Sequence, residues 1–132
     1  MHESTDFQQF QNTVNKYLIR HRSIIDITSK LQETNAKVNR ALAKAITQCG
    51  CTSIKASKQR YCEVKSLDSA HTCLKTHLEG ELCPDCKEIL ASEIGHNLFY
   101  LAALCQVTGL SLEQIINEEN NRLQTLGYFS MT

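Results

Sequence analysis

Two closely spaced pairs of cysteines constrain this chain more than any other feature of its sequence. The first pair is Cys49-x-Cys51 and the second is Cys83-x-x-Cys86, with 31 residues between them. A glycine separates the first two cysteines, and Pro84 follows the third, so each pair adjoins a predicted helix boundary. If the pairs meet, the helix that ends at the first must lie beside the helix that begins at the second.

Short spacings of this kind let two sulfurs point at one ion, and two such pairs complete a tetrahedral thiolate site. We therefore predict structural zinc at Cys49, Cys51, Cys83 and Cys86, because four thiolates leave no open coordination position. An iron–sulfur cluster is less favoured, and free thiols or a redox pair are the alternative to any metal. The first ten residues carry no secretion signal, so we expect a cytoplasmic protein in which disulfides are disfavoured.

Three of the seven cysteines, Cys62, Cys73 and Cys105, receive no role from this pattern. Cys105 ends the longest unbroken apolar run, the eight residues from Leu98, and is predicted to be a small buried side chain. That run is too short to span a membrane, so we expect no membrane partner. His71 and His77 are alternative metal ligands, although surface positions in a loop are the favoured interpretation.

Apolar residues at intervals of three and four predict an all-α fold of four or five helices. The predicted helices cover approximately residues 7–18, 23–49, 67–78, 84–108 and 111–123, with a short extended piece near 53–56. The length of 132 residues fits one domain over 1–132, with a polar insertion at about 49–86.

Several residues are expected to fix the ends and faces of these helices. Ser4 or Thr5 is the expected N-cap of the first helix and Ser23 that of the second. Gly50 and Gly109 are expected to end the helices that precede them. Gly95, inside a predicted helix, indicates close approach of a neighbouring helix. The predicted inward face of the helix at 84–108 consists of Ile89, Ile94, Leu98, Leu101, Ala102 and Cys105.

Two helical stretches outside the cysteine region carry a resemblance. Lys30-Leu-Gln-Glu-Thr-Asn-Ala-Lys37 looks like a Glu-Glu-x-x-Glu motif, and Glu93-Ile-Gly-His-Asn-Leu-Phe-Tyr-Leu looks like Glu-x-x-Asp followed by an apolar run. Together with Gly-Leu-Ser-Leu-Glu-Gln-Ile, they resemble the MazG-like nucleoside triphosphate pyrophosphatases over roughly residues 23–48 and 88–126. The resemblance implies a helical bundle completed by dimerisation, with acidic residues that hold Mg²⁺ for hydrolysis of a nucleoside triphosphate to the monophosphate and pyrophosphate.

Position by position, most of the acidic residues of those motifs are absent. Glu33 matches the first motif, but Thr34 and Lys37 stand where its other acids belong, and His96 replaces the aspartate that follows Glu93. Mg²⁺ requires several oxygen ligands, so we expect no ordinary Mg²⁺-dependent pyrophosphatase activity. Glu33 and Lys37 are predicted to form an ion pair at i, i+4, and His96 to be an interior histidine.

The favoured function is an inactive, zinc-stabilised binding or regulatory protein that holds a nucleotide through Lys37, Arg40 and Lys44. The alternative is a pyrophosphohydrolase with Mn²⁺ on Glu33, Glu93 and His96, because histidine suits Mn²⁺ better than Mg²⁺.

Charge disfavours a third function, nucleic-acid association through the basic residues at 55–65. Fourteen basic residues balance fourteen acidic ones, so the chain as a whole is neutral. The balance is uneven along the sequence, with a net +6 in residues 1–65 and −6 in residues 66–132. Such halves attract one another within or between chains, which is compatible with a dimer or higher homo-oligomer.

Overall fold

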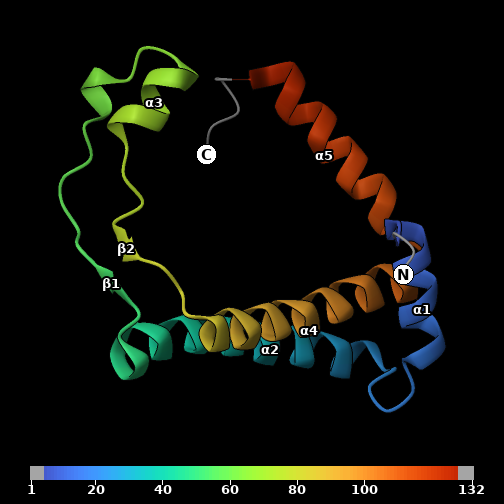
Figure 1. Ribbon diagram of the computed structural model, residues 1–132. Helices are drawn as coiled ribbons and strands as arrows, with labels where there is room; N and C mark the ends of the chain where they lie inside the picture. The colour runs from blue at the N-terminus through green and yellow to red at the C-terminus, as the bar shows by residue number, and fades with distance from the viewer. Residues whose placement is uncertain (1–4, 128–132) are drawn as a thin grey trace.

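Two long helices, α2 (Ile24–Lys44) and α4 (Pro84–Thr108), lie side by side and form the body of the molecule (Figure 1). The computed structural model describes residues 5–127. In chain order, the other elements are α1 (Phe7–Tyr17), a π-helical turn η1 (Ala45–Cys49), β1 (Thr52–Ile54), a 3-10 helix η2 (Tyr61–Glu63), α3 (Leu67–Cys73), β2 (Leu78–Gly80) and α5 (Leu112–Leu126). The prediction of an all-α fold with four or five helices is confirmed.

The ends of the long helices follow from local chemistry. Ser23 caps α2 by accepting a hydrogen bond from the Ile25 backbone N–H, and Gly50 and Gly109 adopt φ values of +77° and +76° where helices end. For α1 the expected cap is wrong: Asp6 accepts the capping bond from Gln9 at 2.6 Å, not Thr5. Ser4 lies outside the described residues.

The core lies where α1 packs across one end of the α2–α4 pair. Its members are Val14, Leu18, Ile27, Ala102 and Ala103, with Phe10, Phe99, Leu104 and Leu112 packed against them. Gln11 joins α1 to the beginning of α5, because it donates to the Leu110 carbonyl (2.8 Å) and accepts from the Leu112 N–H (2.8 Å).

The predicted inward face of α4 is correct only toward its C-terminal end. Ala102 and Cys105 are buried, but Ile89, Ile94 and Leu98 are 55%, 42% and 42% exposed. Among the described residues, α2 is the main neighbour of α4 and α1 packs against its C-terminal part, so part of the apolar surface of α4 stays exposed. The interpretation of Gly95 is also wrong, because a Cβ built there would have nothing within 4 Å.

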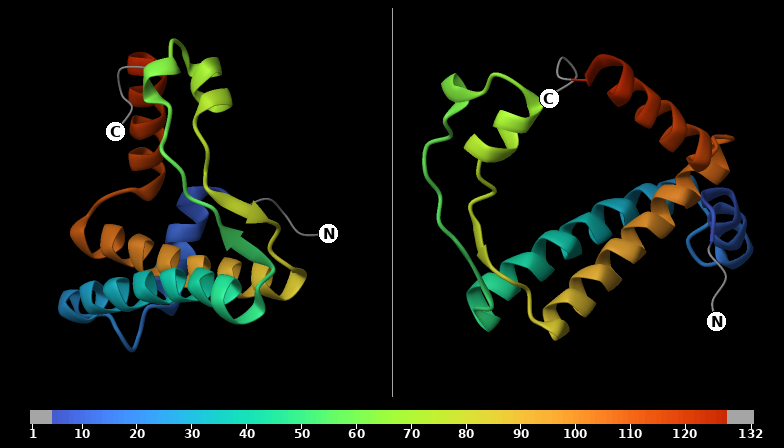
Figure 2. Two further views of the ribbon diagram at one scale, coloured as in Figure 1. Left: turned by 90° about the vertical axis from the view of Figure 1, so that its left-hand side faces the viewer. Right: turned by 45° about the horizontal axis from the view of Figure 1, so that its top comes forward.

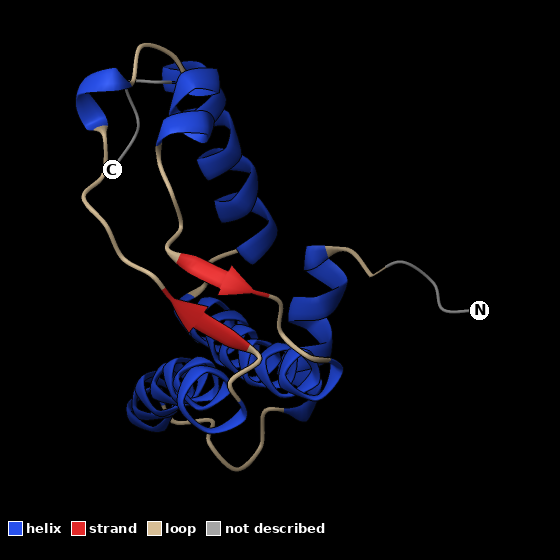
Figure 3. Cartoon of the chain, turned by 60° about the vertical axis from the view of Figure 1, so that its left-hand side comes forward, coloured by secondary structure: helices blue, strands red, loops and turns tan. Residues whose placement is uncertain are grey.

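Residues 51–82 project from the body as an arm (Figures 2 and 3). The base of the arm is a two-stranded antiparallel sheet in which Thr52 faces Gly80 and Ile54 faces Leu78. Farther out lie η2 and α3. Helix α3 begins at the predicted residue, Leu67, but ends at Cys73 instead of Leu78. Leu78 belongs to β2 because its backbone pairs with β1, a long-range interaction that helical periodicity does not reveal.

No single helix among residues 5–127 is both long enough and apolar enough to cross a membrane. Only α4 and α5 taken together meet those requirements, and they are bent by 105° at their junction.

Candidate metal centre and adjacent cleft

The fold brings Cys49, Cys51, Cys83 and Cys86 together at the base of the arm. Their four sulfur atoms all lie within 4.8 Å of one another. Among residues 5–127, this is the one group of three or more histidine, cysteine or acidic side chains close enough to hold a single ion. The predicted juxtaposition of the two cysteine pairs is therefore observed.

The first pair is positioned by a change in helix geometry at the end of α2. Residues 45–49 form a π-helical turn, and the Gly50 N–H donates to the Ala45 carbonyl at 2.8 Å. This wide turn and the left-handed Gly50 turn the chain back, so that Cys51 follows Cys49 toward the same point. Single π-helical turns of this kind are frequent at functional sites.

The second pair is positioned by the beginning of α4. Cys83 is the N-cap, and its sulfur accepts a hydrogen bond from the Cys86 backbone N–H at 3.4 Å. This N–H, together with a hydrogen bond from the Cys86 side chain, lowers the pKa of Cys83 to about 7. The partial positive charge at a helix N-terminus also favours the thiolate form of a cysteine at that position. The pKa values of Cys49 and Cys86 are raised, chiefly by their side-chain hydrogen bonds with Cys83.

The geometry fits zinc. The sulfurs of Cys49 and Cys83 are 3.8 Å apart, and a tetrahedron with Zn–S bonds of about 2.3 Å has edges of about 3.8 Å. All seven cysteines are free thiols, so no disulfide competes for these sulfurs. Because its pKa is lowered, Cys83 deprotonates more readily than an ordinary thiol, which favours its binding to a cation. The four cysteines can thus hold a metal ion.

The remaining cysteines lie elsewhere. Cys105 is buried in α4, as predicted, and burial raises the pKa of its thiol. Cys62 is exposed, and the Cys73 sulfur donates a weak hydrogen bond to the Glu63 carbonyl at 3.9 Å. The alternative ligands His71 and His77 are not members of the cluster. His77 has a φ of +62°, and its buried Nε2 atom has no hydrogen-bond partner among the described residues.

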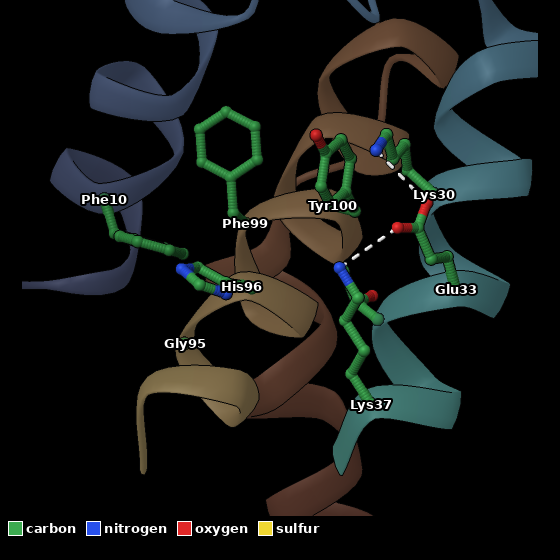
Figure 4. Close-up of a pocket in the computed structure, with 9 residues that line it drawn as sticks. Phe10, Lys30, Glu33, Lys37, Gly95, His96, Phe99 and Tyr100 are labelled. Carbon is green, nitrogen blue, oxygen red and sulfur yellow. Dashed lines mark ion pairs between the residues drawn. The ribbon is translucent and has the colours of Figure 1, made fainter. Parts of the chain in front are cut away.

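A cleft of about 440 Å³ lies between α1, α2 and α4 (Figure 4). Its lining consists of Phe10, Lys30, Glu33, Thr34, Lys37, Gly95, His96, Phe99 and Tyr100. The segments that resemble the two pyrophosphatase motifs thus face a common space. The cleft combines aromatic rings with two lysine side chains.

Glu33 is held between these two lysines. Lys30 Nζ and Lys37 Nζ each lie 3.1 Å from a different oxygen of its carboxylate, as the dashed lines in Figure 4 mark. Hydrogen bonding by Lys37 and then Lys30 lowers the pKa of Glu33, and the same pairing raises the pKa of Lys37. The predicted Glu33–Lys37 ion pair is confirmed. Lys30 was missed, although its i, i+3 spacing to Glu33 was visible in the sequence.

Glu93 and His96 are neighbours on α4, with Glu93 Oε2 3.8 Å from His96 Nδ1. Glu93 Oε2 is buried and has no hydrogen-bond partner among the described residues. The prediction of an interior histidine is wrong: the His96 side chain is 62% exposed at the cleft, because α1 covers only the C-terminal part of α4. Asn97 makes the interhelical polar contact, donating to Thr34 Oγ1 at 3.1 Å.

The three candidate nucleotide-binding residues are distributed along α2. Lys37 lines the cleft, whereas Lys44 lines a smaller cavity beside Cys49 and Cys86. Arg40 is on α2 between them and lines neither cavity. The cationic side chains that line the cleft are therefore Lys30 and Lys37, and not Arg40 or Lys44.

Comparison with family models, curated proteins and solved structures found no match to the chain. The resemblance to MazG-like pyrophosphatases therefore depends on the two motif-like helical segments and the Gly-Leu-Ser-Leu-Glu-Gln-Ile stretch alone.

Proposed function

We propose that this chain is a zinc-stabilised helical protein of the MazG-like type that binds a nucleoside phosphate in the α1–α2–α4 cleft without hydrolysing it. The observation that carries the proposal is the arrangement of Lys30 and Lys37 on either side of Glu33. Two ammonium groups at the mouth of a cavity with aromatic walls suit a ligand with a charged phosphate end and a planar base.

The cleft is poorly equipped for Mg²⁺ chemistry. Both oxygens of Glu33 are engaged by lysine, and Lys37 places a positive charge where a divalent ion would need an acid. Of the two glutamates in the motif-like segments, only Glu93 has a carboxylate oxygen that is buried without a hydrogen-bond partner among the described residues, whereas Mg²⁺ requires octahedral oxygen coordination. Binding without turnover is the function that this donor set supports best.

In this proposal zinc has a structural role. Four thiolates would complete its coordination and leave no site for a substrate or water. The ion would join the end of α2 to the beginning of α4 and fix both strands at the base of the arm. Because α2 and α4 also carry the cleft, the metal would support the alignment of the two cleft walls.

Isothermal titration of the zinc-loaded protein with a panel of nucleoside mono-, di- and triphosphates tests the proposal. We expect binding that strengthens with the number of phosphates and weakens with added salt. A Lys16→Ala variant, altered on the exposed surface of α1, is the matched control and should bind normally. The proposal is wrong if none of the nucleotides gives heat at millimolar concentration.

A hydrolase remains the second candidate because Glu93 Oε2 is buried without a partner and lies 3.8 Å from His96 Nδ1. A softer ion such as Mn²⁺ accepts one nitrogen and a few oxygen ligands, so these groups could hold it with Glu33. Pyrophosphate release assayed with Mn²⁺ distinguishes the candidates. Turnover that disappears in Glu93→Gln and persists in the exposed control Glu88→Gln would favour the hydrolase.

A further inference from the structure

Helix α5 has most of its length uncovered. Its beginning is fixed to α1 through Gln11, but every residue from Asn117 to Leu126 is exposed. These include Leu123 and Leu126, which are 45% and 47% exposed. A helix of 15 residues is marginal in water without packing, so α5 needs a surface that the described part of this chain does not supply.

The far end of the arm is exposed in the same way and carries the opposite charge. We call residues 55–75 the arm tip; it contains five basic and two acidic residues and exposes Tyr61 and Leu67. Arg60 pairs with Glu63, but none of the lysines of the arm tip forms an ion pair with a described residue. Those lysines are Lys55, Lys58, Lys65 and Lys75.

Helix α5 is the acidic counterpart. It contains three glutamates and one arginine, and Arg122 is paired with Glu119 within the helix. The arm tip and α5 project from opposite ends of the α2–α4 pair, on the same side of it (Figures 1 and 2). No hydrogen bond or ion pair joins residues 55–75 to residues 112–126. One chain thus carries two surfaces of opposite charge that no polar contact between these described residues joins.

Helix α4 indicates what kind of partner is missing. Apolar residues occur all round this helix, a pattern typical of a helix that is buried on every side. Within one chain, however, Ile94 and Leu98 are each 42% exposed. The partner must therefore present apolar surface along the body and the appropriate charges at both ends. A second copy of this chain has these properties.

We propose that two copies of this chain associate so that the arm tip of each packs against α5 of the other. A two-fold axis produces this contact twice, because each chain contributes one basic and one acidic surface. The contact pairs the lysines of the arm tip with Glu118 and Glu119, and covers Tyr61 and Leu67 with the apolar side of α5. This inference requires neither a nucleotide in the cleft nor a particular activity.

Charge exchange between two variants tests the proposal. Lys58→Glu/Lys65→Glu makes the arm tip acidic, and Glu118→Lys/Glu119→Lys makes α5 basic. In sedimentation velocity runs on zinc-loaded protein at low salt, the unaltered chain should be dimeric. Each variant alone should dissociate at least about tenfold more readily, because both contacts become repulsive. An equimolar mixture should recover a dimer to within about threefold, because opposite charges then meet in both contacts: the acidic arm tip of one variant faces the basic α5 of the other, and the unaltered basic arm tip faces the unaltered acidic α5.

A double variant on α1 and the loop after it, Lys16→Glu/Arg20→Glu, is the matched control and should associate like the unaltered chain. Circular dichroism confirms that each variant keeps its helices before it is compared. A monomeric unaltered chain at about 100 µM overturns the proposal. A dimer that ignores the charge reversals, or that the mixture fails to restore, also overturns it. Failure of the mixture to restore the dimer would be expected if the arm tip contacted α5 of its own chain.

Discussion

The cysteine centre and the cleft are both formed by α2 and α4, yet they differ in completeness. The centre contains four chemically identical donors whose sulfurs lie within 4.8 Å of one another. The cleft retains only part of the acidic set of the motifs it resembles, and Glu33 is neutralised by Lys30 and Lys37. One pair of helices thus carries a complete set of thiol ligands at one end and a carboxylate neutralised by lysines in the neighbouring cleft.

The largest expected effect is the loss of the metal centre. Cys83→Ser removes one of the four sulfur ligands while keeping a side chain that can cap α4, so zinc content should fall from about one ion per chain to near zero. The midpoint of thermal unfolding should fall by about 10 °C or more. Metal analysis and calorimetry measure the two effects. Cys62→Ser, at an exposed cysteine outside the cluster, is the control and should change neither.

Acidification should affect the cysteine centre and leave the charge of Glu33 in the cleft unchanged. Protons compete with zinc for thiolates, so zinc should be released as the pH falls from 7 to about 5, below the pKa of about 7 of Cys83. Over this range Glu33 stays ionised, because its lysine partners hold its pKa below the ordinary value of 4.5. A zinc-sensitive dye follows the release. Full retention of the ion at pH 5 would contradict thiolate coordination.

Gly80→Ala should weaken the arm base without touching the cleft. Gly80 has a φ of +81°, and a Cβ there would lie 2.7 Å from the Cys51 carbonyl oxygen. The expected cost is about 2 kcal/mol in the free energy of unfolding, measured by urea denaturation. Gly95→Ala is the matched control, because it meets open space inside a helix and should stabilise the protein by about 0.5–1 kcal/mol. Equal effects from both substitutions would contradict the packing described at the arm base.

Lys37→Ala should affect the cleft alone. Removing one of the two ammonium groups should lower affinity for a nucleoside triphosphate about tenfold, because a charge-assisted contact to phosphate is lost. Zinc content should remain unchanged. Titration calorimetry and metal analysis on the same preparation measure both. Affinity equal to that of the unaltered chain would place any bound nucleotide elsewhere.

Much of the framework was predictable because it depends on local interactions. Ser23, Gly50 and Gly109 act at the helix ends where their conformational preferences predict, and Glu33 pairs with Lys37 one helical turn away. Asp6 took the capping role from Thr5 because its carboxylate reaches the Gln9 N–H. Such errors of one or two positions are typical of helix ends, where several residues compete for the same backbone donors.

Errors of another kind arose where distant segments interact. The end of the predicted helix at 67–78 became β2 because it pairs with β1 across the arm. Ile89, Ile94 and Leu98 fit an inward apolar stripe by periodicity, but α2 and α1 leave them exposed. Periodicity identifies an apolar face; it does not say whether the same chain supplies the surface that covers it.

Periodicity, spacing and residue identity were sufficient to predict the all-α fold, the two cysteine pairs and the small number of acidic residues in the two motif-like segments. Three features follow only from the arrangement of the elements in space: the four sulfurs meet, Lys30 joins Lys37 on Glu33, and α5 and the arm tip are left exposed by the rest of residues 5–127. Those features depend on how helices far apart in the chain are placed. A π-helical turn, a hairpin register and the packing of α1 set that placement.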